Sequence, residues 1–241
     1  MLECLVNLQG GNGSRKAKPC RFRFSKKMAD SLDNIPTEEQ PSVVRLSEIR
    51  KTIAYRFTEP VVRLLARTAI TPSTITWFGF LLALGAAALI ITGHPFAAGL
   101  MVLIAGFFDI LDGALARYTN RATRFGAILD STVDRLSEAV VLLGILVLFA
   151  REQLIAQTLL VGVALLGSLL VSYIRARAEA LGLECQVGVF TRAERVIVLA
   201  LGLLLNQIAY ALVIALGIVA VFSFITVIQR LLYVWQQTKI K

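Results

Sequence analysis

The chain has 241 residues, of which 56% are hydrophobic, and its mean hydropathy is +0.71. This composition is too apolar for an ordinary soluble domain, so it predicts a membrane protein, and the length suits one domain. The formal net charge is +9. Because the basic residues flank apolar segments, they indicate a membrane surface and argue against nucleic acid as a partner. One histidine and three cysteines without CxxC spacing argue against a histidine-based triad and against a Cys/His metal site.

The N-terminal segment, residues 1–42, is polar and combines Gly and Ser with a Lys/Arg cluster. This composition predicts a disordered extension, and the acidic stretch after Met28 suggests Met28 as the natural start. Residues 44–69 differ, because apolar side chains recur there at helical spacing with arginines between them. The pattern predicts an amphipathic juxtamembrane helix on the cytoplasmic membrane face; the alternative is an ordinary helix packed on the bundle.

Six apolar segments follow, and they predict an all-α protein with six transmembrane helices in one membrane domain, residues 43–241. We place the segments at about residues 74–92, 96–115, 125–149, 154–174, 196–207 and 209–234. With the N-terminus inside, the outer loops hold a single basic residue, Arg151, whereas the inner segments hold many. This asymmetry follows the positive-inside rule and predicts a multi-pass protein of the cell membrane.

The second and third segments carry four aspartates. Asp109 and Asp112 are three residues apart, and Asp130 and Asp134 are four apart, so each pair shares one helix face. The short connection makes the two helices antiparallel neighbours, so we expect the two faces to meet near the cytoplasmic end. Four carboxylates this close in or near lipid need cations. Ligands that offer only oxygen select hard ions, which predicts two Mg²⁺ ions, with Mn²⁺ as the alternative.

Two other interpretations of the aspartates remain open at this point. The carboxylates could pair with nearby arginines, or they could belong to a cation-coupled transporter. The candidate partners for pairing are Arg117, Arg121, Arg124 and Arg135.

The aspartates also lie in a longer pattern. Asp109-Ile-Leu-Asp112-Gly113-Ala-Leu-Ala116-Arg117 is followed, after eight residues, by Gly126-Ala-Ile-Leu-Asp130-Ser-Thr-Val-Asp134. Its eight fixed positions resemble in full those of the CDP-alcohol phosphotransferase family, from about residue 45 to the C-terminus.

This resemblance implies a role for each motif residue. The four aspartates would bind the metals, and Asp134 would also be the catalytic base that deprotonates the acceptor hydroxyl. A second set would bind the CDP-lipid; for Ser73 and Thr74 within it, a plain helix cap explains the residues equally well. That set is Thr71, Pro72, Ser73, Thr74, Asp112, Gly113, Ala116, Arg117, Thr123 and Gly126.

The acceptor is indicated by charge after the fourth segment. Arg175, Arg192 and Arg195 suggest a site for a phosphate on the acceptor, or alternatively anchors for anionic lipid headgroups. The stretch resembles that of the bacterial phosphatidylinositol phosphate synthases within the family. That resemblance implies acceptor binding by Ser172, Arg175, Arg177 and Arg195.

The resemblance as a whole implies a homodimeric phosphatidyltransferase of phospholipid biosynthesis. It would transfer a phosphatidyl group from CDP-diacylglycerol to inositol 1-phosphate and release CMP. Glycerol 3-phosphate, free inositol and serine are alternative acceptors, and an archaeal-type ether lipid is an alternative donor. A cation-coupled transporter is the alternative that is not an enzyme.

Overall fold

The computed structural model describes residues 61–66, 71–119, 123–183, 185 and 187–239. The chain divides into two compact units, Met1–Ser47 and Glu48–Lys241, and every described residue lies in the second. The predicted extension and most of the predicted amphipathic helix therefore fall outside the described residues. Residues 61–66 of that predicted helix are helical.

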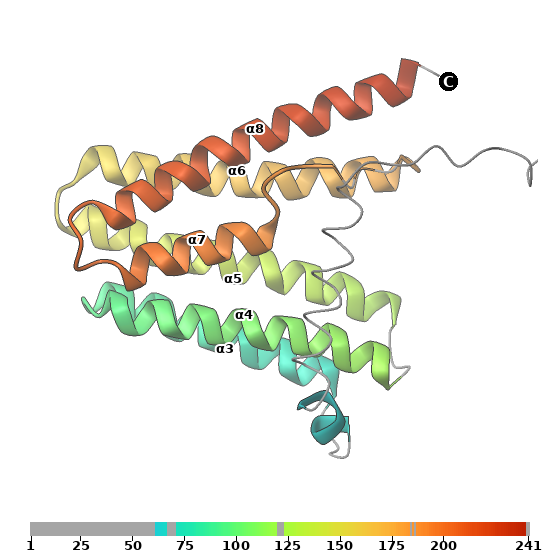
Figure 1. Cartoon of the computed structure of the whole chain (residues 1–241), viewed down its shortest axis with the longest axis horizontal. Coiled ribbons are helices and arrows are strands. Elements are labelled where there is room, and N and C mark those ends of the chain that lie inside the picture. Colours follow the sequence, from blue (N-terminus) through green and yellow to red (C-terminus); the bar gives the residue numbers. More distant parts are fainter. Residues whose placement is uncertain (1–60, 67–70, 120–122, 184, 186, 240–241) are drawn as a thin grey trace, which may run out of the picture. The chain divides into compact units, whose positions relative to one another are not determined.

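Six long helices follow, and the described residues contain no strand (Figure 1). Each coincides with one of the six predicted apolar segments, so the all-helical prediction is confirmed for this part of the chain. The helices are α3 (Pro72–Ile91), α4 (Pro95–Tyr118), α5 (Arg124–Arg151), α6 (Ile155–Ala180), α7 (Arg192–Leu204) and α8 (Ala211–Lys239).

Local sequence fixes where the helices begin. Thr71 caps α3 by accepting a hydrogen bond from the Thr74 N–H, at 3.4 Å. Thr123 caps α5 in the same way, with 2.9 Å between its hydroxyl and the Gly126 nitrogen. At α7, the Glu194 carboxylate accepts from the Thr191 N–H at 2.7 Å. This capping box adds a polar first turn, so α7 begins at residue 192 and not at the predicted 196.

Successive helices run in opposite directions (Figure 1). The N-terminal ends of α3, α5 and α7 therefore lie at the same end of the bundle as the C-terminal ends of α4, α6 and α8. Both aspartate pairs and the arginines that follow α6 belong to this end.

The helices α3 to α8 pack in a closed ring. α3 contacts α4 and α5, α6 contacts α5 and α8, and α7 contacts α4 and α8. Glycine permits two of the closest approaches: a Cβ on Gly144 would lie 3.0 Å from the Ala87 Cα, and one on Gly202 would lie 2.5 Å from the Ala215 Cβ. This packing holds α5 against α3 and α6.

Four helices, α3, α4, α6 and α8, are long and apolar enough to cross a membrane, and they identify a multi-pass membrane protein. Many large apolar side chains on α3 and α8 face outward, as lipid contact requires. α5 has 28 residues but carries charged side chains along its first half. α7 has 13 residues, which is about 20 Å and shorter than a typical span. The prediction of six crossings is thus met by four helices on length and composition.

Candidate functional site

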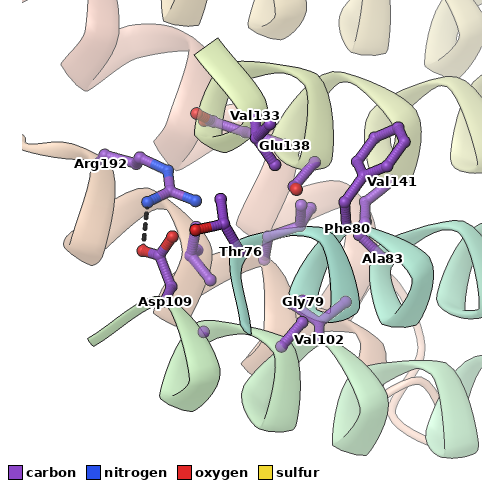
Figure 2. A pocket seen from close by; sticks show the side chains of 15 residues that line it. Thr76, Gly79, Phe80, Ala83, Val102, Asp109, Val133, Glu138, Val141 and Arg192 are labelled. Carbon is purple, nitrogen blue, oxygen red and sulfur yellow. Dashed lines mark hydrogen bonds and ion pairs between the residues drawn. The ribbon is translucent and has the colours of Figure 1, made fainter. Parts of the chain in front are cut away.

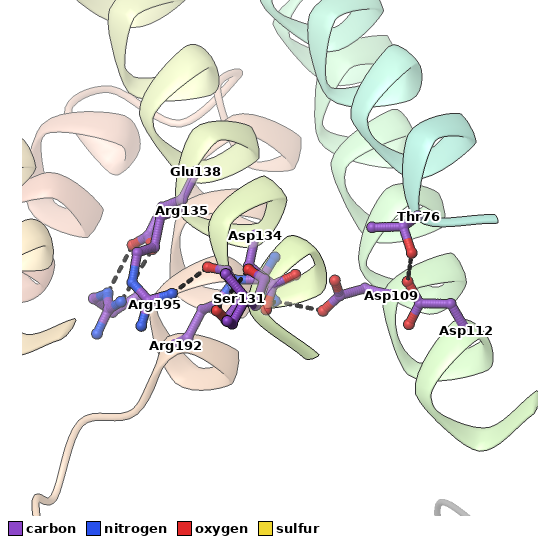
Figure 3. A network of polar contacts seen from close by, with 10 residues as sticks. Thr76, Asp109, Asp112, Ser131, Asp134, Arg135, Glu138, Arg192 and Arg195 are labelled. Carbon is purple, nitrogen blue, oxygen red and sulfur yellow. Dashed lines mark hydrogen bonds and ion pairs between the residues drawn. The ribbon is translucent and has the colours of Figure 1, made fainter. Parts of the chain in front are cut away.

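Three of the four predicted aspartates form a cluster between α4 and α5. Asp109, Asp130 and Asp134 each offer a carboxylate oxygen, and these oxygens lie within 4.8 Å of one another. Asp109 projects from α4 toward α5, as Figure 3 shows. The spacing of the two pairs therefore brings carboxylates from both helices together, as the sequence predicts.

Asp112 lies beside this cluster, one helical turn along α4. Its side chain is buried, and its Oδ2 accepts a hydrogen bond of 2.5 Å from the Thr76 hydroxyl on α3 (Figure 3). Its Oδ1 is buried with no hydrogen-bond partner. Asp112 thus joins α3 to the aspartate end of α4 while keeping one oxygen available to a ligand.

Arg192, the first residue of α7, is a cation that contacts the cluster. Its Nη1 contacts Asp109 Oδ2 and lies 2.8 Å from Asp134 Oδ2 (Figure 3). The arginines that the sequence offered as pairing partners came from α4, α5 and the loop between them, whereas Arg192 comes from a helix 58 residues beyond Asp134 in the chain. Bridging two carboxylates by one guanidinium neutralises only part of their charge.

The remaining oxygens fit a hard metal ion. Asp134 Oδ1 and Asp112 Oδ1 are both buried and without a partner, which is costly for a carboxylate unless a cation binds there. The ligand set contains oxygen only, as Mg²⁺ and Mn²⁺ prefer. Arg192 already occupies a cation position between Asp109 and Asp134. Metal binding by this cluster is therefore consistent with the donors present.

A cavity of about 340 Å³ opens on one side of the aspartates, and we call it the α3–α5 cavity. All the residues predicted for CDP-lipid binding line it except Thr74, whose hydroxyl lies 2.8 Å from that of Thr71 within the helix cap. Small side chains leave its walls open. Its lining residues are Thr71, Pro72, Ser73, Thr76, Asp112, Gly113, Ala116, Arg117, Thr123, Gly126, Ala127 and Asp130.

A second cavity, of about 480 Å³, opens on the other side, and we call it the arginine cavity. Three of the four residues predicted for the acceptor, Ser172, Arg175 and Arg195, line it. The fourth, Arg177, is exposed and lies outside the lining, because residues two apart on a helix face different directions. The cavity also contains Arg192, whose charge suggested a phosphate site in the sequence, and residues that the sequence did not assign to the acceptor: Ser131, Asp134, Arg135, Glu179, Thr191 and Arg230.

Arg230 and Glu138 are the most informative of the residues that sequence reasoning missed. Arg230 donates to the Val187 carbonyl at 2.9 Å and to the Val171 carbonyl at 2.5 Å, so it ties α8 to α6 and to the loop before α7. The sequence feature that could have identified Arg230 is a charge inside the sixth apolar segment. Glu138 forms a buried ion pair with Arg195. The sequence feature that could have identified Glu138 is its position one helical turn after Asp134.

A third cavity, of about 40 Å³, lies deeper between α3, α4, α5 and α7 (Figure 2). Its walls are largely apolar, with Thr76, Asp109, Glu138 and Arg192 at the polar end. The space is too small for a substrate. It marks where the polar site gives way to the apolar core.

The comparisons with known proteins agree with this geometry. A sequence model of the CDP-alcohol phosphatidyltransferase family matches residues 69–229, which is most of the chain and includes both aspartate pairs. The chain therefore belongs to the CDP-alcohol phosphatidyltransferase family, and the resemblance noted in its sequence is confirmed.

Among curated relatives, the archaetidylinositol phosphate synthase of Methanothermobacter thermautotrophicus is 40% identical over 197 residues, covering 80% of this chain and 96% of the relative. Among solved structures, Mycobacterium tuberculosis phosphatidylinositol phosphate synthase with CDP-DAG bound aligns with a TM-score of 0.70 at 37% identity, covering 75% of this chain and 94% of that one. The same enzyme in complex with manganese and citrate aligns with a TM-score of 0.68 at 37% identity, covering 74% and 88%.

Proposed function

We propose that this enzyme transfers a phosphatidyl group from CDP-diacylglycerol to inositol 1-phosphate and releases CMP. One observation carries the proposal: neighbouring aspartates on a single helix, α5, line two different cavities. Asp130 lines the α3–α5 cavity, and Asp134 lines the arginine cavity. A donor and an acceptor in these cavities would meet at the aspartate cluster. The solved relative that carries CDP-DAG, and the synthases among the similar proteins, support the assignment of substrates.

The α3–α5 cavity suits the nucleotide end of the donor. Gly113, Ala116 and Gly126 allow close approach to the backbone of α4 and α5. Arg117 supplies the positive charge that a pyrophosphate requires, and the hydroxyls of Thr71 and Thr123 line the same wall. These residues would orient the cytidine and the pyrophosphate so that the lipid-side phosphorus lies at the aspartates.

The aspartates would hold the divalent cations, for which we propose two Mg²⁺ ions with Mn²⁺ as a substitute. Asp109, Asp112, Asp130 and Asp134 supply the oxygens, and the manganese complex of the M. tuberculosis relative supports this assignment. Bound ions would neutralise the pyrophosphate charge that grows as CMP departs.

Asp134 would act as the general base. It takes the proton from the acceptor hydroxyl, whose oxygen then forms a new bond to the lipid-side phosphorus as the bond from that phosphorus to CMP breaks. Asp134 suits the role because it belongs to both the aspartate cluster and the arginine cavity. No Cys or His nucleophile is found among the described residues that line the two cavities, and Ser131 donates its hydroxyl to the Ile128 carbonyl, which favours direct displacement.

The arginine cavity suits an acceptor that already bears a phosphate. Five arginines line it, which is more positive charge than a neutral polyol requires. Ser172 adds a hydroxyl from α6, and Arg175 lies one turn further along the same helix. This charge favours inositol 1-phosphate or glycerol 3-phosphate over free inositol or serine.

We also propose the membrane arrangement that the sequence predicts. Residues 43–241 would form the membrane domain, with six crossings and an amphipathic helix over residues 44–69 on the cytoplasmic face. The reactive end would face the cytoplasm at the cell membrane, because the arginines gather there. The active form would be a homodimer, as the family resemblance implies.

The test is CMP release by the purified enzyme with CDP-diacylglycerol and Mg²⁺, with inositol 1-phosphate, glycerol 3-phosphate, inositol or serine as acceptor. We expect release with inositol 1-phosphate and loss of release with EDTA. Turnover with another acceptor alone would refute the proposed acceptor and keep the reaction class.

A parallel assay should use a CDP-activated ether lipid, because one curated relative is an archaetidylinositol phosphate synthase. Activity only with the ether lipid would change the donor and leave both cavities as assigned. Absence of CMP release with every donor and acceptor pair would contradict the proposal.

A further inference from the structure

We propose that Glu138 is the positioning residue of the acceptor site: it fixes the guanidinium of Arg195 so that one donor edge is reserved for the acceptor phosphate. The inference rests on the proposed function and deepens it. Glu138 itself does not line the arginine cavity, so it would act only through Arg195.

The pair joins two helices through two hydrogen bonds. Arg195 Nε donates to Glu138 Oε1 at 2.7 Å, and Arg195 Nη2 donates to Oε2 at 3.0 Å (Figure 3). Both side chains are almost fully buried, with 2% of Arg195 and 4% of Glu138 exposed. A bidentate contact in a planar fork leaves the guanidinium no freedom to rotate.

One donor group of Arg195 is left over. Nη1 is buried and has no hydrogen-bond partner among the residues that the structure describes, although Arg195 lines the arginine cavity. Because the guanidinium is planar, a group not engaged by Glu138 lies on the edge turned away from it. A buried, charged donor without a partner is costly, and a bound phosphate oxygen would satisfy it.

The position of Glu138 links the acceptor to the chemistry. Asp130, Asp134 and Glu138 are spaced by four residues along α5, so they follow one face of that helix. The carboxylate that holds Arg195 is therefore one turn from the proposed base. This arrangement would hold the acceptor phosphate at a fixed distance from Asp134, and so place the hydroxyl for attack.

A simpler explanation is that the pair only stabilises the bundle. A stabilising role predicts that removing Glu138 lowers the unfolding temperature and affects both substrates alike. A positioning role predicts a change confined to the acceptor. Buried ion pairs contribute little net stability compared with apolar residues, which leaves positioning as the stronger reason for two buried charges at this place.

The experiment measures steady-state CMP release by detergent-purified full-length protein. The variants are Glu138→Gln, Glu138→Asp, Arg195→Lys and the double variant Glu138→Gln/Arg195→Lys. For Glu138→Gln we expect the KM for inositol 1-phosphate to rise about tenfold, with the KM for CDP-diacylglycerol changed less than about twofold. Glu138→Asp keeps the charge and should recover part of the loss. If Glu138→Gln does not fold, Glu138→Asp tests the positioning role in its place.

The double variant is the decisive arm. If Glu138 acts through Arg195, the double variant has the same acceptor KM as Arg195→Lys alone. The matched control is Glu152→Gln, the same change at the far end of α5, where the residue is exposed. Its two KM values should equal those of the wild type.

Equal increases in both KM values, or independent effects in the double variant, would overturn the positioning role. An active wild type whose acceptor KM is unchanged by Glu138→Gln would overturn it as well. A wild type that releases no CMP with inositol 1-phosphate would instead refute the proposed function, so the two failures can be told apart.

Discussion

The two large cavities at the aspartate end differ in how they would recognise a ligand. The α3–α5 cavity is lined mainly by small residues, with two aspartates and a single arginine, so it offers space and access to the backbone. The arginine cavity has five arginines and two carboxylates, and no glycine, among its described lining residues, so it offers charge. A bulky nucleotide that brings its own cations needs the first kind of site, and a small phosphorylated alcohol needs the second.

The cavities also differ in where their residues lie in the chain. The α3–α5 cavity is built from residues 71–130, and six of its twelve lining residues are fixed positions of the aspartate motif. The arginine cavity draws on α5, α6, α7 and α8, between residues 127 and 230. Under the proposed function, the donor site would be of local origin and the acceptor site of tertiary origin.

The strongest way to break this comparison is to disable the group common to the aspartate cluster and the arginine cavity. Asp134→Asn should lower the rate of CMP release about 10²–10⁴-fold, because a general base is lost while the volume is kept. Binding of CDP-diacylglycerol should change little, because Asp134 does not line the α3–α5 cavity. Titration of the variant with the donor measures this. Near-normal turnover would show that Asp134 is not the base.

Removing charge from the arginine cavity should affect the acceptor alone. Arg195→Gln should raise the acceptor KM about 10–100-fold, because a charge-assisted contact to phosphate is lost. The donor KM should stay within about threefold of the wild type. Since Glu138 loses its partner in this variant, Arg195→Lys is the matched form that keeps a positive charge. Equal effects on both substrates would indicate a structural role.

Adding volume to the α3–α5 cavity should affect the donor alone. Among the described residues, a Cβ on Gly113 would meet the Arg117 guanidinium alone, at 3.7 Å, which leaves room for Gly113→Ala. We expect the donor KM to rise about tenfold, because the methyl group takes space from the ligand. The thermal midpoint should stay the same or increase, because alanine favours a helix more than glycine does. A lower midpoint with an unchanged donor KM would contradict this assignment.

The smallest effect is expected at Arg177, and it separates the resemblance from the geometry. Arg177 is exposed on α6 and lies outside the lining of the arginine cavity. Arg177→Gln should therefore change the acceptor KM by less than about twofold, as expected for an exposed charge. Arg175→Gln, two residues away on the same helix and inside the cavity, provides the comparison. A larger effect at Arg177 than at Arg175 would restore the assignment made from the sequence.

The sequence predicted the helices and the meeting of the two aspartate pairs because their signals are local. Apolar length located all six helices, and the fixed spacing of Asp109, Asp112, Asp130 and Asp134 gave the meeting of α4 and α5. Where a local signal was overlooked, the boundary moved: the Thr191 to Glu194 capping box explains the earlier start of α7.

The arginine cavity was predictable only in part, because its residues come from helices distant in the chain. Arg192 was expected near the acceptor, yet its guanidinium contacts Asp109 and Asp134. The pairing of Glu138 with Arg195 spans 57 residues, and no periodicity or motif reports such a contact. Arg230 is held by backbone carbonyls that only the folded bundle brings near it.

The separation of donor and acceptor by one aspartate cluster is tested most directly by a crystal structure with Mn²⁺ and CDP-diacylglycerol, measured at the manganese absorption edge. We expect anomalous density among Asp109, Asp112, Asp130 and Asp134, with Arg192 displaced from their oxygens and the cytidine in the α3–α5 cavity. Cytidine among the arginines, or manganese away from these carboxylates, would contradict the assignment of both cavities.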